Sequence, residues 1–234
     1  MTMKLAIPGW DVPTLAVAGS SERIAVRRIF CMGLNYHDHK KEMGITTDVP
    51  PFVFTKATCH AVACEPEKVT DLKYPSRTTN YQWECELTAV IGKTCINVSA
   101  ANANDYIWGY AVGLDMTRRD LQLWCKDHAL PWEIGKDVEQ SGPVGAVVPA
   151  SQMGHPTAGA LWLTCNGVTK QKSDISQMIL DTPHIIEWLS SYYTLEPGDV
   201  IMTGTPGGIG PVKVGDVVEA GIGDLPVLKV RIVA

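Results

Sequence analysis

The chain has 234 residues, of which 45% are hydrophobic and 19% are charged, and its formal net charge is −5 at pH 7. This composition is typical of a globular protein with a large core, and it excludes the basic surface of a nucleic-acid-binding protein. No apolar run approaches the roughly 18 residues of a membrane span, and Pro8, Asp11 and Pro13 interrupt the segment where a secretory signal would be apolar, so we expect a cytoplasmic protein.

Residues 1–28 look irregular, and we expect a small N-terminal region followed by a main domain over residues 29–234. The stretch GLNYHDHKKEMG, residues 33–44, contains a charged run that is a poor strand. On a helical turn His39 and Glu42 are neighbours, so the carboxylate can orient the imidazole as a general base. The alternative is a solvated, charged turn without a catalytic role.

The stretch WECELTAVIG, residues 83–92, contains two glutamates in a run that otherwise indicates a buried strand. Side chains alternate along a strand, so Glu84 and Glu86 point to the same face, about 7 Å apart. The apolar run from Leu87 to Ile91 indicates a strand covered on both sides. Two buried like charges need a cation or a cluster of basic residues between them, unless this face is wet and the glutamates are ordinary surface residues.

Residues 107–115 predict a strand with one face of small side chains, which lets another backbone approach closely. Asp115 ends this face, although it can equally be a plain turn residue. With Glu84 and Glu86 it would give three hard oxygen ligands, which is the chemistry of Mg²⁺ or Mn²⁺ rather than zinc. No spacing rule brings Asp115 to the glutamates, so the sequence leaves their meeting open.

Helical patterns are few. One covers residues 99–105, one starts near Thr117, which is expected to cap it, and one covers residues 173–189, where Pro183 should break or kink it.

Turn signals separate many short strands. Asn166-Gly167 predicts a two-residue hairpin, and Pro-Gly and Gly-Asp turns precede strands at Val200–Met202 and Val217–Val218. Because strands and helices do not alternate regularly, we expect a β-rich α+β fold rather than a parallel Rossmann sheet.

The chain contains seven cysteines, an odd number without a CxxC pair. This pattern predicts reduced core residues rather than a disulfide framework or a zinc ribbon. The best soft-metal candidate, Cys59-His60 with Cys64, lacks the second ligand pair of a zinc site.

Several longer phrases resemble the fumarylacetoacetate hydrolase family and occur in that family's order. From about Phe30 to the C-terminus they are GLNYHDHKKEM, PFVFTK, NYQWECELTAVIGK, GYAVGLDMTRRDLQ, PWEIGK, SGPVG, CNGVTKQ and LEPGDVIMTGTPGGIG. The phrase GYAVGLDMTRRDLQ, with PWEIGK and the NYQWE lead-in, is most similar to the bacterial fumarylpyruvate hydrolases within that family. The resemblance implies a mixed β-roll, usually a homodimer, with Mg²⁺ or Mn²⁺ in a cleft lined by strands.

The resemblance also implies roles for individual residues. Glu84, Glu86 and Asp115 match the family's metal ligands, and His39 and Glu42 match its general base and orienting carboxylate. Lys136 matches the active-site lysine. The positions that hold the carboxylate and oxo groups of the substrate are Arg119, Gln122 and Thr205. His37 stands where the family more often has a small residue and receives no role.

The implied reaction cleaves the carbon-carbon bond of an acylpyruvate, fumarylpyruvate or maleylpyruvate, to pyruvate and a dicarboxylic acid in gentisate-type aromatic catabolism. The departing carbanion must spread its charge into an enolate that a cation stabilises. His39 with Glu42 would take a proton from the water that attacks the C4 carbonyl. Gly207 replaces a charged or polar residue that is common in the family, which leaves the distal acyl pocket undefined.

Two alternatives belong to other classes. Oxaloacetate decarboxylation forms the same pyruvate enolate without attack by water, so it would depend far less on His39. A Ca²⁺-binding β-domain without enzyme activity would need a clustered acidic loop such as DxDxDG, which the sequence lacks.

Overall fold

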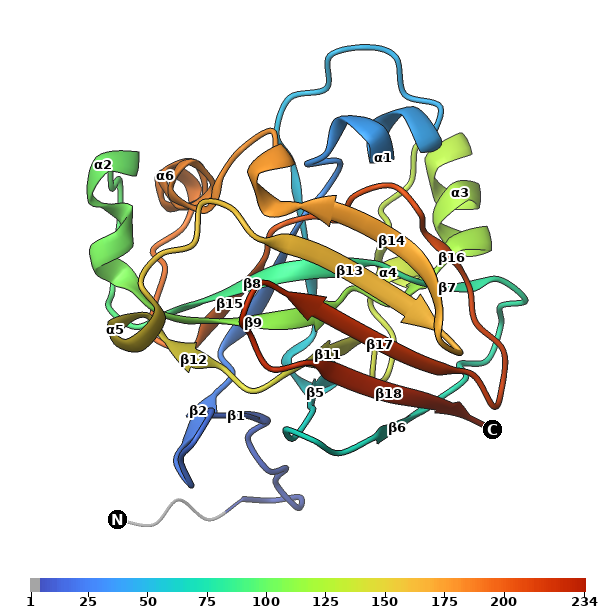
Figure 1. Ribbon diagram of the computed structural model, residues 1–234, viewed down its shortest axis with the longest axis horizontal. Helices are drawn as coiled ribbons and strands as arrows, with labels where there is room; N and C mark the ends of the chain where they lie inside the picture. Colours follow the sequence, from blue (N-terminus) through green and yellow to red (C-terminus); the bar gives the residue numbers. More distant parts are fainter. Residues whose placement is uncertain (1–4) are drawn as a thin grey trace.

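The computed structural model describes residues 5–234 and confirms a strand-rich α+β fold in which curled sheets surround a common core (Figure 1). The largest sheet has the strand order β4-β3-β15-β8-β9-β11-β5, and β12 pairs with β9. Its strands are β3 Arg28–Met32, β4 Val53–Lys56, β5 Ala61–Ala63, β8 Cys85–Ile91, β9 Ile107–Leu114, β11 Gly142–Val144, β12 Val148–Pro149 and β15 Asp199–Met202.

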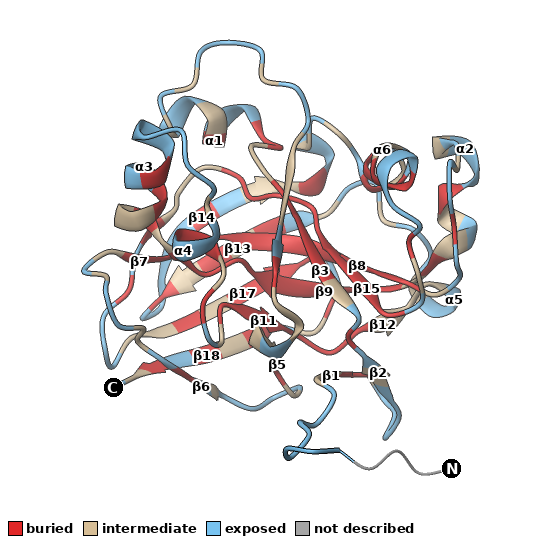
Figure 2. Cartoon of the chain, turned by 180° about the vertical axis from the view of Figure 1, so that it is seen from behind, coloured by how far each residue is buried: buried red, intermediate tan, exposed pale blue. Residues whose placement is uncertain are grey.

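β8 lies in the middle of this sheet, and every one of its residues is buried (Figure 2). This confirms the prediction of a strand covered on both faces. The small residues of β9 were predicted to let another backbone approach closely, and Gly109 does so. A Cβ at Gly109 would lie 2.3 Å from the backbone oxygen of Val148 in β12.

A second sheet has five strands in the order β14-β13-β17-β18-β6. Its strands are β6 Thr70–Lys73, β13 Ala160–Cys165, β14 Val168–Asp174, β17 Val217–Ile222 and β18 Leu228–Val233. β13 and β14 form the hairpin predicted at Asn166-Gly167, and both turn residues have positive φ. One core cluster joins the two sheets, with Leu87 of β8, Leu161 of β13 and Val218 of β17 among its buried members.

Two smaller sheets complete the strands. One contains β7 Tyr81–Trp83, β10 Thr117–Arg118 and β16 Gly210–Pro211, and the other contains β1 Thr14–Ala16 and β2 Arg23–Ala25. In the N-terminal region, Leu15 and Val26 are buried in a cluster with Ile29 of β3, so this region packs directly on the main sheet.

The helices lie at the periphery (Figure 1). They are α1 His37–Glu42, α2 Ala100–Ala103, α3 Arg119–Asp127, α4 Glu133–Lys136, α5 Ala150–Met153 and α6 Thr182–Tyr192, with 3-10 turns at η1 Thr58–His60, η2 Asn104–Tyr106 and η3 Ile175–Gln177. In the part of the chain that the structure describes, none of these helices has the length and apolar character to cross a membrane. Six of the seven cysteines are buried, as predicted, whereas Cys59 is exposed.

The helix predicted over residues 173–189 is wrong in its first half, because β14 continues to Asp174 and η3 follows it. α6 begins later, where Asp181 caps it by accepting a 3.0 Å hydrogen bond from the N–H of His184. Pro183 lies in the first turn of α6, where backbone N–H groups have no partner within the helix, so the missing N–H of proline costs no hydrogen bond. The proline therefore starts this helix instead of breaking it.

Candidate active site

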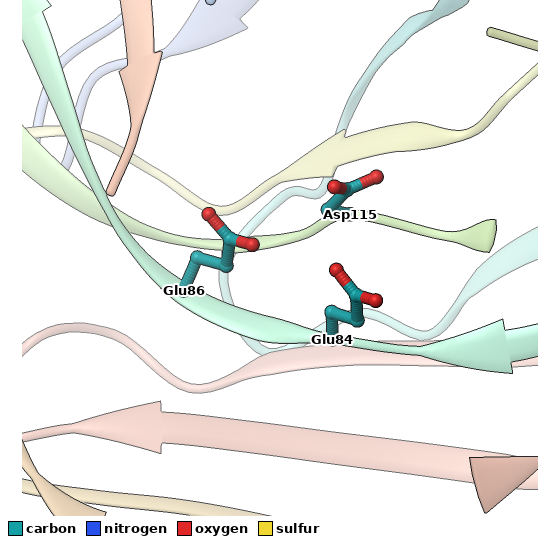
Figure 3. A group of neighbouring side chains, drawn as sticks. All are labelled: Glu84, Glu86 and Asp115. Atoms are coloured by element: carbon teal, nitrogen blue, oxygen red, sulfur yellow. The ribbon is translucent and has the colours of Figure 1, made fainter. Parts of the chain in front are cut away.

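The antiparallel pairing of β8 and β9 brings the three predicted carboxylates together. Glu86 lies opposite Gly113, and two residues further on the N–H of Asp115 donates to the backbone oxygen of Glu84 at 2.9 Å. Glu84, Glu86 and Asp115 each offer one oxygen, and these oxygens all lie within 4.8 Å of one another (Figure 3). All three side chains are buried. The meeting that the sequence left open therefore depends on the register of these two strands.

Basic side chains neutralise two of the three carboxylates. Lys136 Nζ lies 2.7 Å from Glu84 Oε2 and 2.8 Å from Asp115 Oδ2. Arg119 pairs with the other oxygen of Glu84, and Lys56 Nζ lies 2.8 Å from Asp115 Oδ1. From the two glutamates on one strand face we predicted a cation or a cluster of basic residues, and Lys136, Arg119 and Lys56 form such a cluster.

These ion pairs decide the charge states of the groups that form them. Burial opposes ionisation of Glu84, but Lys136 and then Arg119 outweigh burial and hold the pKa of Glu84 well below its usual range. Burial also acts to lower the pKa of Lys136, but Asp115 and Glu84 outweigh it and raise that pKa. Lys136 is therefore an ammonium in this cluster.

Glu86 is the carboxylate that lacks such neutralisation. Among residues 5–234, no lysine or arginine forms an ion pair with it, and its Oε2 accepts a 2.6 Å hydrogen bond from the N–H of Gly204. Burial, followed by the charges of Asp115 and Glu84, raises the pKa of Glu86 well above its usual value. A buried carboxylate without a cation, next to two other carboxylates, provides hard oxygen donors that fit Mg²⁺ or Mn²⁺.

Thr117 belongs to this cluster, and its predicted role as a helix cap is wrong. The N-cap residue of α3 is Arg118, whose side chain makes no capping hydrogen bond. The Thr117 hydroxyl instead donates to the backbone oxygen of Asp115 at 3.1 Å and accepts a 2.8 Å hydrogen bond from Lys136 Nζ. The short strand β10 places it there, because Thr117 pairs with Gln82 of β7 before the helix begins.

The other polar residues implied by the resemblance gather around one cavity beside the carboxylates. Gln122, Lys136 and Thr205 line it together with Glu84 and Glu86. Arg119 reaches the site through its neighbours: its guanidinium donates to Gln122, Glu84 and Gln82. The structure thus places all of these residues in one site, while their contacts with substrate remain a prediction.

His39 and Glu42 are neighbours on α1, as the helical interpretation predicted. His39 Nδ1 lies 3.2 Å from Glu42 Oε2, and Glu42 Oε1 accepts a 3.1 Å hydrogen bond from the N–H of Gly208. His39 is only 5% exposed and lines the same cavity as Glu84, so it is not part of a solvated turn. His37 is exposed on the same helix.

Sequence reasoning assigned no role to Lys56, which is 2% exposed at the end of β4. Its ammonium forms an ion pair with Asp115 and donates its hydrogen bonds to Ser141 Oγ at 3.1 Å and to the backbone oxygens of Met116 and Lys136. The signal that would have found it is a lysine at the end of the apolar run PFVFTK, because a lysine is buried only when it has partners.

Gln171 is the second residue that the sequence did not reveal. It is fully buried on β14 and its side chain holds the peptide between the two glutamates, because its Oε1 accepts the N–H of Cys85 at 3.0 Å. Its Nε2 donates to Thr205 Oγ1 at 2.8 Å and to the backbone oxygen of Pro206 at 2.9 Å. Gln171 therefore fixes strand β8 to the loop with the sequence TGTP, residues 203–206, which we call the TGTP loop.

The substitution Gln171→Leu is expected to lower the free energy of unfolding by about 3 kcal/mol, because each buried polar group left without a partner costs about 1–3 kcal/mol. Urea unfolding followed by circular dichroism would measure this loss. Gln177→Leu is the matched control, since Gln177 is exposed. Equal stability of the two variants would show that the hydrogen bonds of Gln171 between β8 and the TGTP loop do not contribute to the free energy of unfolding.

The chain is similar to several known proteins. The family model described as "Fumarylacetoacetate (FAA) hydrolase C-terminal" matches residues 28–233. The chain is 42% identical over 207 residues to the mitochondrial oxaloacetate tautomerase of Bos taurus, a match that covers 88% of this chain and 91% of that protein. It is 46% identical over 165 residues to the fumarylpyruvate hydrolase of Ralstonia sp, covering 70% of this chain and 83% of that protein.

A solved structure shows the same fold. It is the crystal structure of fumarylpyruvate hydrolase from Pseudomonas aeruginosa in complex with Mn²⁺ and pyruvate, which has a TM-score of 0.96 and 41% sequence identity to this chain. The match covers 98% of this chain and 99% of that one.

Proposed function

Because the chain belongs to the fumarylacetoacetate hydrolase family, we propose that it is a metal-dependent hydrolase that cleaves the carbon-carbon bond of an acylpyruvate, fumarylpyruvate or maleylpyruvate, to pyruvate and a dicarboxylic acid. The observation that carries this proposal is a group of three buried carboxylates, two of which, Glu84 and Glu86, line one cavity with His39. His39 is in turn paired with Glu42. The names of the Ralstonia and Pseudomonas aeruginosa relatives supply the substrate.

Glu84, Glu86 and Asp115 would hold Mg²⁺ or Mn²⁺, which when bound polarises the oxo group of the substrate and stabilises enolate charge. His39 would take a proton from the water that attacks the C4 carbonyl. Glu42 orients the imidazole through Nδ1 and stabilises it once it is protonated.

The tetrahedral intermediate then collapses with cleavage of the C3–C4 bond, and its electron pair passes to the pyruvate fragment as an enolate. The enolate takes a proton at C3 to give pyruvate, which balances the proton that His39 removed from water. Lys136 would neutralise the charge that develops during the cleavage step. Its raised pKa keeps it protonated, which favours charge stabilisation over early release of its proton. The N–H of Gly204 keeps Glu86 in place through the 2.6 Å hydrogen bond, and glycine is required there because its φ is +99° and a Cβ would lie 2.6 Å from Asn35 Cβ.

The test is an assay of the purified chain with fumarylpyruvate, maleylpyruvate and oxaloacetate in the presence of Mg²⁺ or Mn²⁺. We expect pyruvate release from at least one acylpyruvate, loss of that activity with a chelator, and its return when metal is restored. Chelator-resistant turnover, or no turnover of either acylpyruvate, would contradict the proposal.

A second candidate is chemistry on oxaloacetate at the same site, and the similarity to the bovine oxaloacetate tautomerase over 88% of the chain favours it to a comparable degree. Decarboxylation would release pyruvate and CO₂ from oxaloacetate, whereas tautomerisation would only interconvert its keto and enol forms. The same assay separates these outcomes when CO₂ release and enol absorbance are both followed.

The proposal includes a metabolic pathway, a cellular location and an oligomeric state. Fumarylpyruvate and maleylpyruvate are ring-cleavage products of gentisate-type aromatic catabolism, and a cytoplasmic enzyme fits such a pathway. The family resemblance supports a homodimer, which analytical ultracentrifugation would measure.

A further inference from the structure

One side of the active-site cavity is formed by α3. Counted from Arg119, Gln122 lies three residues and Lys126 seven residues further along the chain, which places all three on one face of this helix. Arg119 pairs with Glu84 at the start of the helix, and Lys126 lies roughly 10 Å further along the axis. Gln122 and Lys126 both line the cavity that contains Glu84.

Lys126 is a cation of this cavity that has no carboxylate partner among the described residues. The other lysine of the cavity, Lys136, is already paired with Glu84 and Asp115. Lys126 Nζ donates one hydrogen bond, to the backbone oxygen of Met43 at 3.2 Å. Because an ammonium has three donors, two remain available to an anion.

The lining of this cavity is otherwise largely apolar. The apolar side chains of this lining come from Met32, Leu34, Met43, Ile45, Phe54 and Trp132. A cavity lined by a carboxylate cluster, by apolar side chains and by a separate lysine suits a hydrocarbon spacer that ends in an anion.

We propose that Lys126 binds the carboxylate at the far end of the acyl group, so that the site selects acylpyruvates with a dicarboxylic acyl group over those with an uncharged end. This inference rests on the proposed function and names the substrate class of that site. In oxaloacetate the second carboxylate is one methylene from the ketone, so a molecule held at the carboxylate cluster would not reach Lys126.

The test compares fumarylpyruvate with acetylpyruvate, whose acyl group ends in a methyl. In Lys126→Met, the ratio of kcat/KM for fumarylpyruvate to kcat/KM for acetylpyruvate is expected to fall about tenfold, because a charge-assisted hydrogen bond is lost at an exposed position. Lys126→Arg is expected to restore most of the ratio. Lys41→Met, at an exposed lysine of α1, is the control for loss of charge and is expected to keep the wild-type ratio.

Lys40→Met tests the alternative that the far carboxylate of the acyl group lies in a neighbouring cavity. Lys40 lines that cavity with Val49, Phe52 and Ile179. A ratio that falls in Lys40→Met and not in Lys126→Met would overturn the inference. So would equal losses on both substrates in Lys126→Met, since these would mean that Lys126 only holds Met43. Wild-type inactivity on both acylpyruvates would overturn the proposed function and this inference together, whereas an active wild type with an unchanged ratio in Lys126→Met overturns the inference alone.

Discussion

Replacing Glu86 with glutamine is expected to abolish metal-dependent turnover and to leave the metal-free fold at least as stable as the wild type. The loss follows because a neutral amide is a poor ligand for a hard divalent cation. The stability follows because Glu86 is buried without a basic partner, so that removing its charge removes a desolvation cost while the amide oxygen can still accept from Gly204. Thermal unfolding with and without Mn²⁺, together with turnover, would measure both effects.

The pH dependence of this stability difference has a definite sign. Since the pKa of Glu86 is raised in the folded protein, the native state binds more protons than the unfolded chain as pH rises above the usual glutamate value. The metal-free wild type therefore loses stability over that rise, and E86Q does not. The advantage of E86Q should be absent in acid, where both states are protonated, and should grow towards neutral pH.

Glu139→Gln is the control for E86Q, because Glu139 is exposed. It is expected to keep wild-type turnover and the wild-type response to Mn²⁺. If E86Q retained wild-type turnover and metal content, Glu86 would not be a ligand.

Replacing His39 with asparagine is expected to lower kcat for acylpyruvate hydrolysis by about 10² to 10⁴, which is the usual contribution of general-base catalysis. Glu42→Gln is expected to lower it less, since the imidazole stays in place but loses the nearby charge that stabilises its protonated form. Steady-state kinetics at saturating metal would measure both values.

His37→Asn is the matched control, because His37 is exposed on the same helix and two residues away. It should keep wild-type kinetics. Oxaloacetate provides a further comparison: decarboxylation needs no attacking water, so its rate should fall far less in H39N. Equal rates for H39N and H37N on acylpyruvates would remove the general base from the mechanism.

The sequence alone predicted the residues that act within one element better than those that depend on pairing between elements. Alternation along a strand was enough to place Glu84 and Glu86 on one face, and helical spacing was enough to join His39 to Glu42. The approach of Asp115 depends on the β8–β9 register, which no local pattern encodes. The resemblance to a family supplied that residue where the pattern could not.

The misses have similar physical causes. Gln171 lies among exposed neighbours on β14, so the local pattern does not separate it from an ordinary surface residue. The phrase CNGVTKQ, which ends at Gln171, is the signal that could have found it. Thr117 and Pro183 carry strong local signals, but strand pairing overrode the first and the first helical turn accommodated the second.

The basic residues around the carboxylate cluster have a consequence for the order of ligand binding. Lys56, Lys136 and Arg119 equal the three carboxylates in number, although they pair only with Glu84 and Asp115, so a divalent ion would leave the buried site with surplus positive charge. A dianionic oxo acid cancels that surplus. We therefore expect metal and substrate to strengthen one another's binding reciprocally, so that the free protein would hold its ion more loosely than the protein saturated with substrate.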